Sequence, residues 1–406
     1  MPDPHAPISS RKAPFFIPIS RFLEAVISVA LVFGSHGTAR ADLPSLKPLV
    51  VVVPDITSSK LYDRDGEQRW PPRIFRFIKD FEALSCDETG VPRQEMEVGW
   101  PQHDIYEGLV KHLTKAGYEV HRFGYDWRLG QEHAGSELAR FLGALRPGPV
   151  SLVSHGMGGL VASRYLKQHG GSRVHRLVSI GTPYLGTPGT LNVLESGEVL
   201  PNFLSTFLAG YFQDLFRRNP SWFQLLPSPS YFELLGTSVV TKRLAGKAAE
   251  APQLIDSYAA FEGFLRTRPW INLAMLDQAR NVLSATQLVA ILGSVDSYFI
   301  VGDGQPTIGS LSYAFENRDG REEVVSIRPQ WTNGDGTVVL GSATMGGRIE
   351  SIHPGHSYYV AEPHDGLLTH HMTMAQLTKI LGGSGAPIAG MRQQPQTSLR
   401  TPQSVN

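Results

Sequence analysis

The sequence predicts an α/β fold with a mostly parallel central sheet and helices on both of its faces. Short apolar runs typical of buried strands recur along the chain, and amphipathic segments of helical period separate the early ones. One run, VSLVSH (150–155), passes through glycines directly into the helical pattern LVASRYLKQHG. That is the layout of a sharp strand-to-helix turn, which lifts one side chain above a sheet.

Composition excludes several classes of protein. The chain has 406 residues, which permits one large domain with insertions or two domains. Its 37 Lys and Arg balance 37 Asp and Glu, so no charge excess indicates a nucleic-acid partner. Cys86 is the only cysteine, which rules out an intrachain disulfide and any metal site built from several thiolates.

The first 41 residues have the pattern of a signal peptide. Arg11, Lys12 and Arg21 precede the apolar run 25–33, and an A-x-A cleavage box ends at Ala41. The run is shorter than the roughly 20 apolar residues of a membrane-spanning helix. We therefore expect export, to the periplasm or outside the cell, after cleavage near Ala41. An uncleaved membrane anchor is the alternative.

The elements of the predicted core follow in chain order. Strand-like runs lie at 49–53, 118–127, 149–155, 174–181, 287–294 and 356–363. Helical segments lie at 104–117 and 136–148, each with a glycine where a helix C-cap favours one. Residues 46–185 and 286–381 are thus expected to form the α/β core.

Residues 186–285 break this alternation and predict a helical cap insertion. Within it, residues 203–216 carry a doubled apolar stripe that suits a helix with a wide apolar face. That face either packs on the main domain or lines a groove for an acyl chain. Residues 382–406 are polar and rich in Gly and Pro, which predicts a disordered tail.

The strand-to-helix turn is the first candidate for chemistry. The usual pattern there is G-x-S-x-G, with serine as the nucleophile, but Gly156 occupies the central position. Covalent acyl transfer requires an oxygen or sulfur atom at that point. Losing a triad nucleophile lowers the rate on the order of a million-fold. The candidate oxyanion donors are the backbone N–H groups of Met157, after the turn, and Ile56, after the first strand.

In folds with such a turn, the nucleophile is followed along the chain by an acid and then by a histidine. Candidates for both lie downstream of the turn. Asp335 lies in NGDGTV, where glycines on both sides permit a tight turn that holds a carboxylate. His364 follows the last predicted strand, at the carboxyl edge where open α/β sheets bind ligands. Its rivals, His370 and His371, fall in a helical pattern.

A series of segments resembles the lecithin:cholesterol acyltransferase-like branch of the α/β-hydrolases. In chain order they are VVVPDITSSKLY, GYEVHRFGYDWRL, LVSHGMGGLVASRYL, VSIGTPYLGTPG, NPSWFQLLPSPSYF, VGDGQPT and NGDGTVVLGSA. They look like the family's first strand and loop, Y-D-W-R segment, elbow, G-T-P-x-x-G turn, cap segment, G-x-G-x-P-T turn and acid loop. Lysosomal phospholipase A2 and phospholipid:diacylglycerol acyltransferases belong to the same branch.

The resemblance implies an α/β-hydrolase fold that acts on phospholipids or other acyl-ester lipids. It implies contact with a membrane surface and no metal or organic cofactor. It makes Asp335 the acid, His364 the base, and Met157 with Ile56 the oxyanion donors. Trp70 and the segment that follows it, to about residue 99, would form the lid and lipid-contact region.

Three positions depart from the family's pattern. Gly156 stands where the family has its nucleophilic serine, and Asp55 and Ser58 replace glycines of the oxyanion loop. A carboxylate at Asp55 opposes negative charge developing nearby unless it points away. Ser154 is a substitute hydroxyl, but the turn is expected to leave it below the site. Because glycine relaxes a strained elbow, we expect the reversal Gly156→Ser to cost at most roughly 1–2 kcal/mol.

Two functions follow. One is an exported lipid acyltransferase or phospholipase-like protein, weak or inactive without its nucleophile, with slow hydrolysis by a water activated at His364 and Asp335 left open. The other is a lipid- or ester-binding pseudoenzyme without turnover. A structural surface protein is less favoured, because the acid and histidine loops are intact.

Overall fold

The computed structural model describes residues 46–396, apart from 74, 102–103, 198–202, 247–250 and 320. The predicted signal peptide and the last ten residues of the predicted tail lie outside this part of the chain. Among the described residues, no helix combines the length and the apolarity needed to cross a bilayer.

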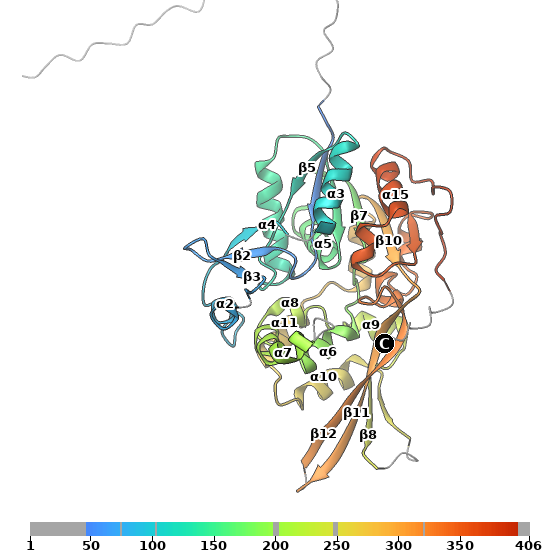
Figure 1. Ribbon diagram of the computed structural model, residues 1–406. Coiled ribbons are helices and arrows are strands. Elements are labelled where there is room, and N and C mark those ends of the chain that lie inside the picture. The colour runs from blue at the N-terminus through green and yellow to red at the C-terminus, as the bar shows by residue number, and fades with distance from the viewer. Residues whose placement is uncertain are drawn as a thin grey trace, which may run out of the picture. The chain divides into compact units, whose positions relative to one another are not determined.

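A six-stranded parallel sheet forms the centre of the fold, as predicted (Figure 1). Its spatial order is β13–β10–β7–β6–β1–β5. The strands are β1 (Leu49–Val53), β5 (Glu119–Arg122), β6 (Val150–His155), β7 (Val174–Ile180), β10 (Asp296–Gly302) and β13 (Ser357–Val360). Because parallel strands end at the same edge, the residues that follow β1, β6 and β13 are brought together there.

Strand β1, LVVVV, shows why the sheet is buried on both faces. Leu49, Val51 and Val53 pack into one core cluster, and Val50 and Val52 pack into the other. Helices on the second face are α3 (Asp104–Lys115) and α15 (His371–Leu381); those on the first are α4 (Gln131–Ala144), α5 (Met157–His169) and α12 (Ala285–Leu292). The predicted helices on both faces are confirmed.

The strand predicted at 287–294 is wrong. This apolar run lies in helix α12, and the core strand β10 follows it. Ser284 caps the helix, because its hydroxyl accepts the Gln287 N–H while the Gln287 side chain accepts the Ser284 N–H. A short apolar run cannot be assigned to strand or helix from periodicity alone, and the capping box decides it here.

The cap contains more than the predicted helices. Its helices are α6 (Pro188–Ser196), α7 (Phe203–Phe216), α8 (Pro220–Phe223), α9 (Pro229–Leu235), α10 (Tyr258–Arg266) and α11 (Leu273–Ala279). Two strands, β8 (Val240–Leu244) and β9 (Gln253–Ile255), join the hairpin of β11 (Gln305–Arg318) and β12 (Arg321–Gly334) in a second sheet. Figure 1 shows β8, β11 and β12 extending side by side beyond the cap helices.

A small antiparallel sheet borders the predicted lid region, residues 70–99, at both of its ends. It consists of β2 (Lys60–Tyr62), β3 (Gln68–Trp70) and β4 (Glu97–Gly99), and helix α2 (Phe77–Leu84) follows β3. The Trp70 ring packs edge-on against Trp127, with 4.9 Å between centroids. Trp70 is therefore part of the packed interior of this region.

The disordered tail predicted from residue 382 is wrong as far as residue 396. Met391 is buried, and Tyr359 of strand β13 forms a backbone bridge with Arg392. The Arg392 guanidinium also pairs with the fully buried carboxylate of Asp303, at 2.5 and 2.9 Å. These tertiary contacts outweigh the polar, Gly- and Pro-rich composition on which the prediction rested.

Candidate active site

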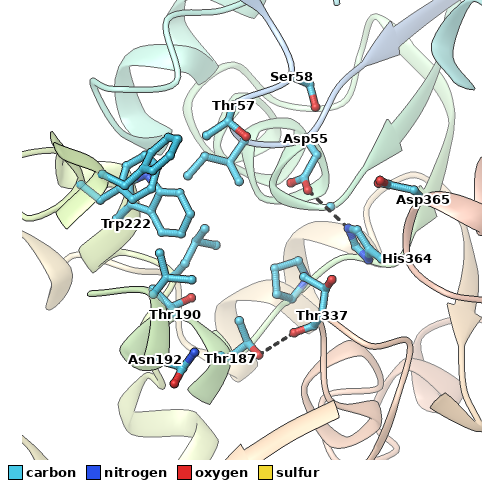
Figure 2. Close-up of a pocket in the computed structure, with 18 of the residues that line it drawn as sticks. Asp55, Thr57, Ser58, Thr187, Thr190, Asn192, Trp222, Thr337, His364 and Asp365 are labelled. Carbon is cyan, nitrogen blue, oxygen red and sulfur yellow. Dashed lines mark hydrogen bonds and ion pairs between the residues drawn. The ribbon is translucent and has the colours of Figure 1, made fainter. Parts of the chain in front are cut away.

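Residues from distant parts of the chain meet at the wall of one cavity (Figure 2). Asp55 follows β1, Gly156 follows β6 and His364 follows β13, and all three line a cavity of about 930 Å³. That volume falls within the range of small-molecule sites. Large apolar side chains of the cap and lid complete the wall: Trp70, Phe77, Leu208, Phe212, Phe216 and Trp222. Figure 2 shows Trp222 facing Asp55 and His364 across the cavity.

The structure brings the predicted acid and base together. His364 Nδ1 lies 2.7 Å from Asp335 Oδ2, and the His364 backbone N–H donates to the Asp335 carbonyl. The other carboxylate oxygen, Oδ1, accepts the backbone N–H groups of Thr337 and Val338 at 2.9 and 2.7 Å. The two backbone N–H groups thus fix the orientation of the Asp335 carboxylate, and its Oδ2 remains to pair with the imidazole. The rival His370 lies instead 3.8 Å from Glu362.

Asp55 fills the space that a side chain at position 156 would need. Gly156 has φ 51° and ψ −127° at the start of helix α5. A Cβ atom built there would lie 2.1 Å from Asp55 Oδ1 and 2.2 Å from its Cγ. The expectation that Gly156→Ser costs at most roughly 1–2 kcal/mol of stability considered backbone strain alone. It is therefore wrong, because the contact with Asp55 adds to that cost.

The Asp55 carboxylate also takes the partners of a nucleophile. Its Oδ1 accepts the backbone N–H of Met157 at 2.5 Å, and its Oδ2 lies 3.3 Å from His364 Nε2. The predicted oxyanion donor of Met157 is therefore engaged by a carboxylate of this chain. Ile56, the other predicted donor, lines the cavity.

Two carboxylates set the protonation of His364. Burial alone would lower the pKa of His364, but the charge and hydrogen bond of Asp335, and then those of Asp55, raise it well above its usual value. Burial would raise the pKa of Asp55, but His364 and the Met157 N–H outweigh it and lower that pKa. The imidazole therefore lies between two carboxylates, and Asp55 occupies the Nε2 side from which a base would act.

Comparisons with known proteins agree with this fold. Residues 95–281 match the family described as "Lecithin:cholesterol acyltransferase". This match covers a little under half of the chain, which is therefore similar to a lecithin:cholesterol acyltransferase-like family. It has an α/β-hydrolase fold, and it resembles the solved Tle4–Tli4 complex with a TM-score of 0.55. That likeness covers 82% of this chain and 98% of the other at 15% sequence identity, and so concerns the fold alone.

Curated relatives of this acyltransferase-like chain are known from plants and animals. "Phospholipase A(1) LCAT3" of Arabidopsis thaliana is 26% identical over 281 residues, which cover 59% of this chain and 62% of that protein. "Lysosomal phospholipase A and acyltransferase" of Bos taurus is 25% identical over 302 residues, covering 70% and 68%. The chain thus spans under two thirds of the Arabidopsis relative's length.

A second histidine lies beside the elbow of this acyltransferase-like chain. His155 is buried, and its ring centroid lies 4.4 Å from that of His364. Its Nδ1 lies 3.0 Å from the Tyr106 hydroxyl and its Nε2 lies 3.2 Å from the His364 carbonyl. Burial and the charge of His364 lower the pKa of His155 well below its usual value. The sequence analysis missed His155 and Tyr106, although the position of His155 directly before Gly156 was a usable signal.

Two other residues singled out in the sequence, the substitute hydroxyl Ser154 and the lid residue Trp70, are each held by a hydrogen bond to a backbone carbonyl. Ser154 is fully buried, and its hydroxyl donates to the Val178 carbonyl of the neighbouring strand at 3.3 Å. Trp70 lines the cavity, is 8% exposed, and donates its indole N–H to the Thr57 carbonyl. Among the described residues of the predicted lid region, 70–99, the exposed large apolar side chains are Phe75, Ile78, Val91 and Val98, at 97%, 48%, 57% and 36% exposure.

Proposed function

We propose that this acyltransferase-like protein is exported and binds acyl-ester lipids in the cavity beside Asp55 and His364 without forming an acyl-enzyme intermediate. One observation carries the proposal. The Asp55 carboxylate occupies the space of a side chain at position 156 and holds both Met157 N–H and His364 Nε2. The site lacks an elbow nucleophile, and the groups that would serve one are already engaged.

The cavity supports an acyl-ester lipid as the ligand. Its cap-side wall is apolar, and each buried CH₂ group of an acyl chain contributes about 0.8 kcal/mol. Two carboxylates, Asp335 and Asp55, flank the His364 imidazole at the apex. Like-charge repulsion there disfavours a free fatty-acid carboxylate, so a neutral ester fits better than its hydrolysis product. The names of the relatives, phospholipase and acyltransferase, point to the same class of ligand.

Residual acyl transfer is the second candidate function, and the intact pairing of Asp335 with His364 favours it. A fluorophosphonate probe separates the two functions, because it labels only an activated nucleophile. We expect no labelling of the wild-type chain or of Gly156→Ser, and labelling of Gly156→Ser combined with Asp55→Gly. Adding His364→Ala to that pair should abolish the labelling. Wild-type labelling that disappears in Ser154→Ala would overturn the proposal.

Lipid binding is tested separately with a fluorescent-acyl phosphatidylcholine. Val193 lines the cavity, so Val193→Arg is expected to weaken binding at least about tenfold, by placing a charge against the acyl chain. Val325→Arg is the matched control, because Val325 is exposed on strand β12. Equal loss in both variants, or no binding by the wild-type chain, would contradict the assignment of the cavity.

Export is tested by sequencing the N-terminus of the protein recovered outside the cytoplasm. The expected mature chain begins after Ala41. The complete N-terminus in a membrane fraction would favour the uncleaved anchor.

A further inference from the structure

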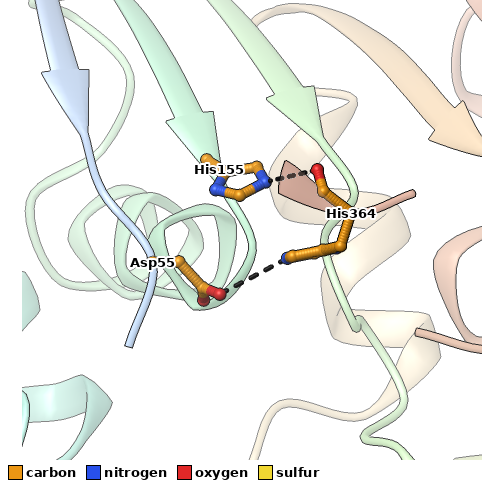
Figure 3. A group of neighbouring side chains, drawn as sticks. All are labelled: Asp55, His155 and His364. Atoms are coloured by element: carbon orange, nitrogen blue, oxygen red, sulfur yellow. Dashed lines mark hydrogen bonds and ion pairs between the residues drawn. The ribbon is translucent and has the colours of Figure 1, made fainter. Parts of the chain in front are cut away.

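Three side chains converge beside the elbow from the ends of three different strands (Figure 3). Asp55, His155 and His364 each offer one ligand atom, and these atoms all lie within 4.8 Å of one another. We propose that they form a site for one divalent cation of the Zn²⁺ class, held by Asp55 Oδ2, His364 Nε2 and His155 Nδ1. This departs from the cofactor-free chemistry that the family resemblance implies.

The three side chains are already oriented as metal ligands are. A metal-bound histidine almost always donates its other ring N–H to a carboxylate or a backbone carbonyl, and a metal-bound carboxylate is itself hydrogen-bonded. His364 Nδ1 pairs with Asp335, and His155 Nε2 pairs with the His364 carbonyl. Asp55 Oδ1 accepts the Met157 N–H. In each case the second polar atom is left to face the cluster.

The backbone carbonyl determines the tautomer of His155. A carbonyl oxygen can only accept, so Nε2 carries the proton and Nδ1 carries the lone pair. That lone pair now accepts the Tyr106 hydroxyl, which also lies 3.3 Å from Ser58 Oγ. On metal binding, the Tyr106 hydroxyl turns its proton to Ser58, and His155 Nδ1 becomes a ligand.

The distances suit a small cation after a modest inward movement. Tetrahedral Zn²⁺ with bonds near 2.0–2.2 Å places its ligand atoms about 3.3–3.5 Å apart. Asp55 Oδ2 and His364 Nε2 already have that separation, 3.3 Å. The wider limit of 4.8 Å for the whole group means that the His155 ring or the Asp55 carboxylate moves inward.

The charge of the cluster also favours a cation. Two carboxylates, Asp55 and Asp335, flank one imidazole ring. A divalent cation in place of the Nε2 proton neutralises both carboxylates at once. A pair of histidines and one carboxylate is also a ligand set that Zn²⁺ accepts. The substitution of Gly156 contributes to the site, because a side chain there would displace Asp55.

The site opens on the lipid cavity, which Asp55 and His364 both line. Three protein ligands leave one position for water, and Zn²⁺ lowers the pKa of bound water to about 7. The resulting hydroxide attacks the ester carbonyl carbon, the bond to the alcohol oxygen breaks, and the hydroxide proton passes to the departing alkoxide. The products are a fatty-acid carboxylate and an alcohol. This hydrolytic consequence rests on the proposed lipid-ester function, whereas the metal site does not.

Metal binding is tested on the whole chain by calorimetric titration with Zn²⁺ and by the visible absorption of bound Co²⁺. We expect one equivalent of each, with the absorption of a four-coordinate site. Asp55→Asn and His364→Gln should each weaken Zn²⁺ more than about 100-fold, since even outer-shell partners contribute 10–100-fold. Asp365→Asn is the matched control, because Asp365 lines the same cavity outside the cluster and should keep wild-type affinity.

Three results would overturn the metal site. They are no binding at millimolar Zn²⁺, equal affinity in Asp55→Asn and the wild-type chain, or the same loss in Asp365→Asn. Failure of the proposed function gives a different result: Zn²⁺ binds as expected, but the fluorescent phosphatidylcholine binds neither to the Zn²⁺-free protein nor to the Zn²⁺-bound protein. If both ligands bind, release of fatty acid that requires Zn²⁺ and is lost in Asp55→Asn supports the hydrolytic step, and its absence refutes that step.

Discussion

Restoring serine at the elbow should fail unless Asp55 is removed with it. In Gly156→Ser, the new Cβ lies 2.1 Å from Asp55 Oδ1, so the carboxylate must leave. It then loses its bonds to Met157 N–H and His364, each worth about 1.5–3 kcal/mol because a charged group takes part. A non-glycine residue at φ 51° adds about 1–3 kcal/mol of backbone strain. The two bonds together account for about 3–6 kcal/mol, so we expect a total loss of about 4–9 kcal/mol from the free energy of unfolding.

A double-mutant cycle measures this conflict. Asp55→Gly alone loses the same two bonds, so the sum of the single variants counts them twice. The combined variant should therefore be less destabilised than that sum by about 3–6 kcal/mol, the contribution of the two bonds. It should also be more stable than Gly156→Ser alone, because no displaced carboxylate is left to accommodate. Urea unfolding followed by circular dichroism supplies the four free energies.

Backbone strain is separated by a matched control at the other end of helix α5. Gly170 also has a positive φ, 73°, but a Cβ there meets nothing within 4 Å. Gly170→Ser should cost only the strain, about 1–3 kcal/mol. If the effects at 55 and 156 add to within about 0.5 kcal/mol, the two side chains do not compete for space and the reasoning fails.

Three further predictions concern charge and burial. The pKa of His364 is raised in the folded protein, so His364 contributes stability that is complete below its unfolded pKa of about 6.5 and is lost as the pH rises through its folded pKa. In Asp55→Asn, urea unfolding at a series of pH values should show this loss of stability at lower pH than in the wild-type chain. An unchanged pH profile would contradict the prediction. Burial raises the pKa of Cys86 to about 12, so DTNB at pH 8 should react only after unfolding, and fast native labelling would refute this. Arg392→Ala leaves the buried Asp303 without its guanidinium and should cost about 1–3 kcal/mol in urea unfolding, whereas Arg64→Ala, in an exposed pair, should cost less than about 1 kcal/mol; equal effects would count against the packed tail.

The parts of the fold that depend on local patterns could be predicted from the sequence. The run at 49–53 is a strand because consecutive Val residues suit a sheet buried on both faces. The stripe at 203–216 forms helix α7, which both packs on its neighbours and lines the cavity. The hairpin of β11 and β12 was missed because its partner strand β8 lies in the cap, far away in the sequence.

The loops of Asp335 and His364 could also be predicted from their local sequence. Asp335 lies between glycines, and His364 follows a strand, so their sequence context already limits their geometry. The position of the Asp55 side chain could not be predicted from local sequence. Its departure from the family's glycine was visible, but its direction depends on Gly156, about a hundred residues away, and on His364, about three hundred away. Contacts over such separations leave no periodicity in the chain.

The mutual exclusion of Asp55 and a side chain at 156 constrains the order in which substitutions at these two positions are tolerated. A side chain at 156 has no room while the carboxylate of residue 55 is in its present position. A stepwise route to serine at 156 therefore begins with a smaller residue at 55, because the reverse order passes through a destabilised protein.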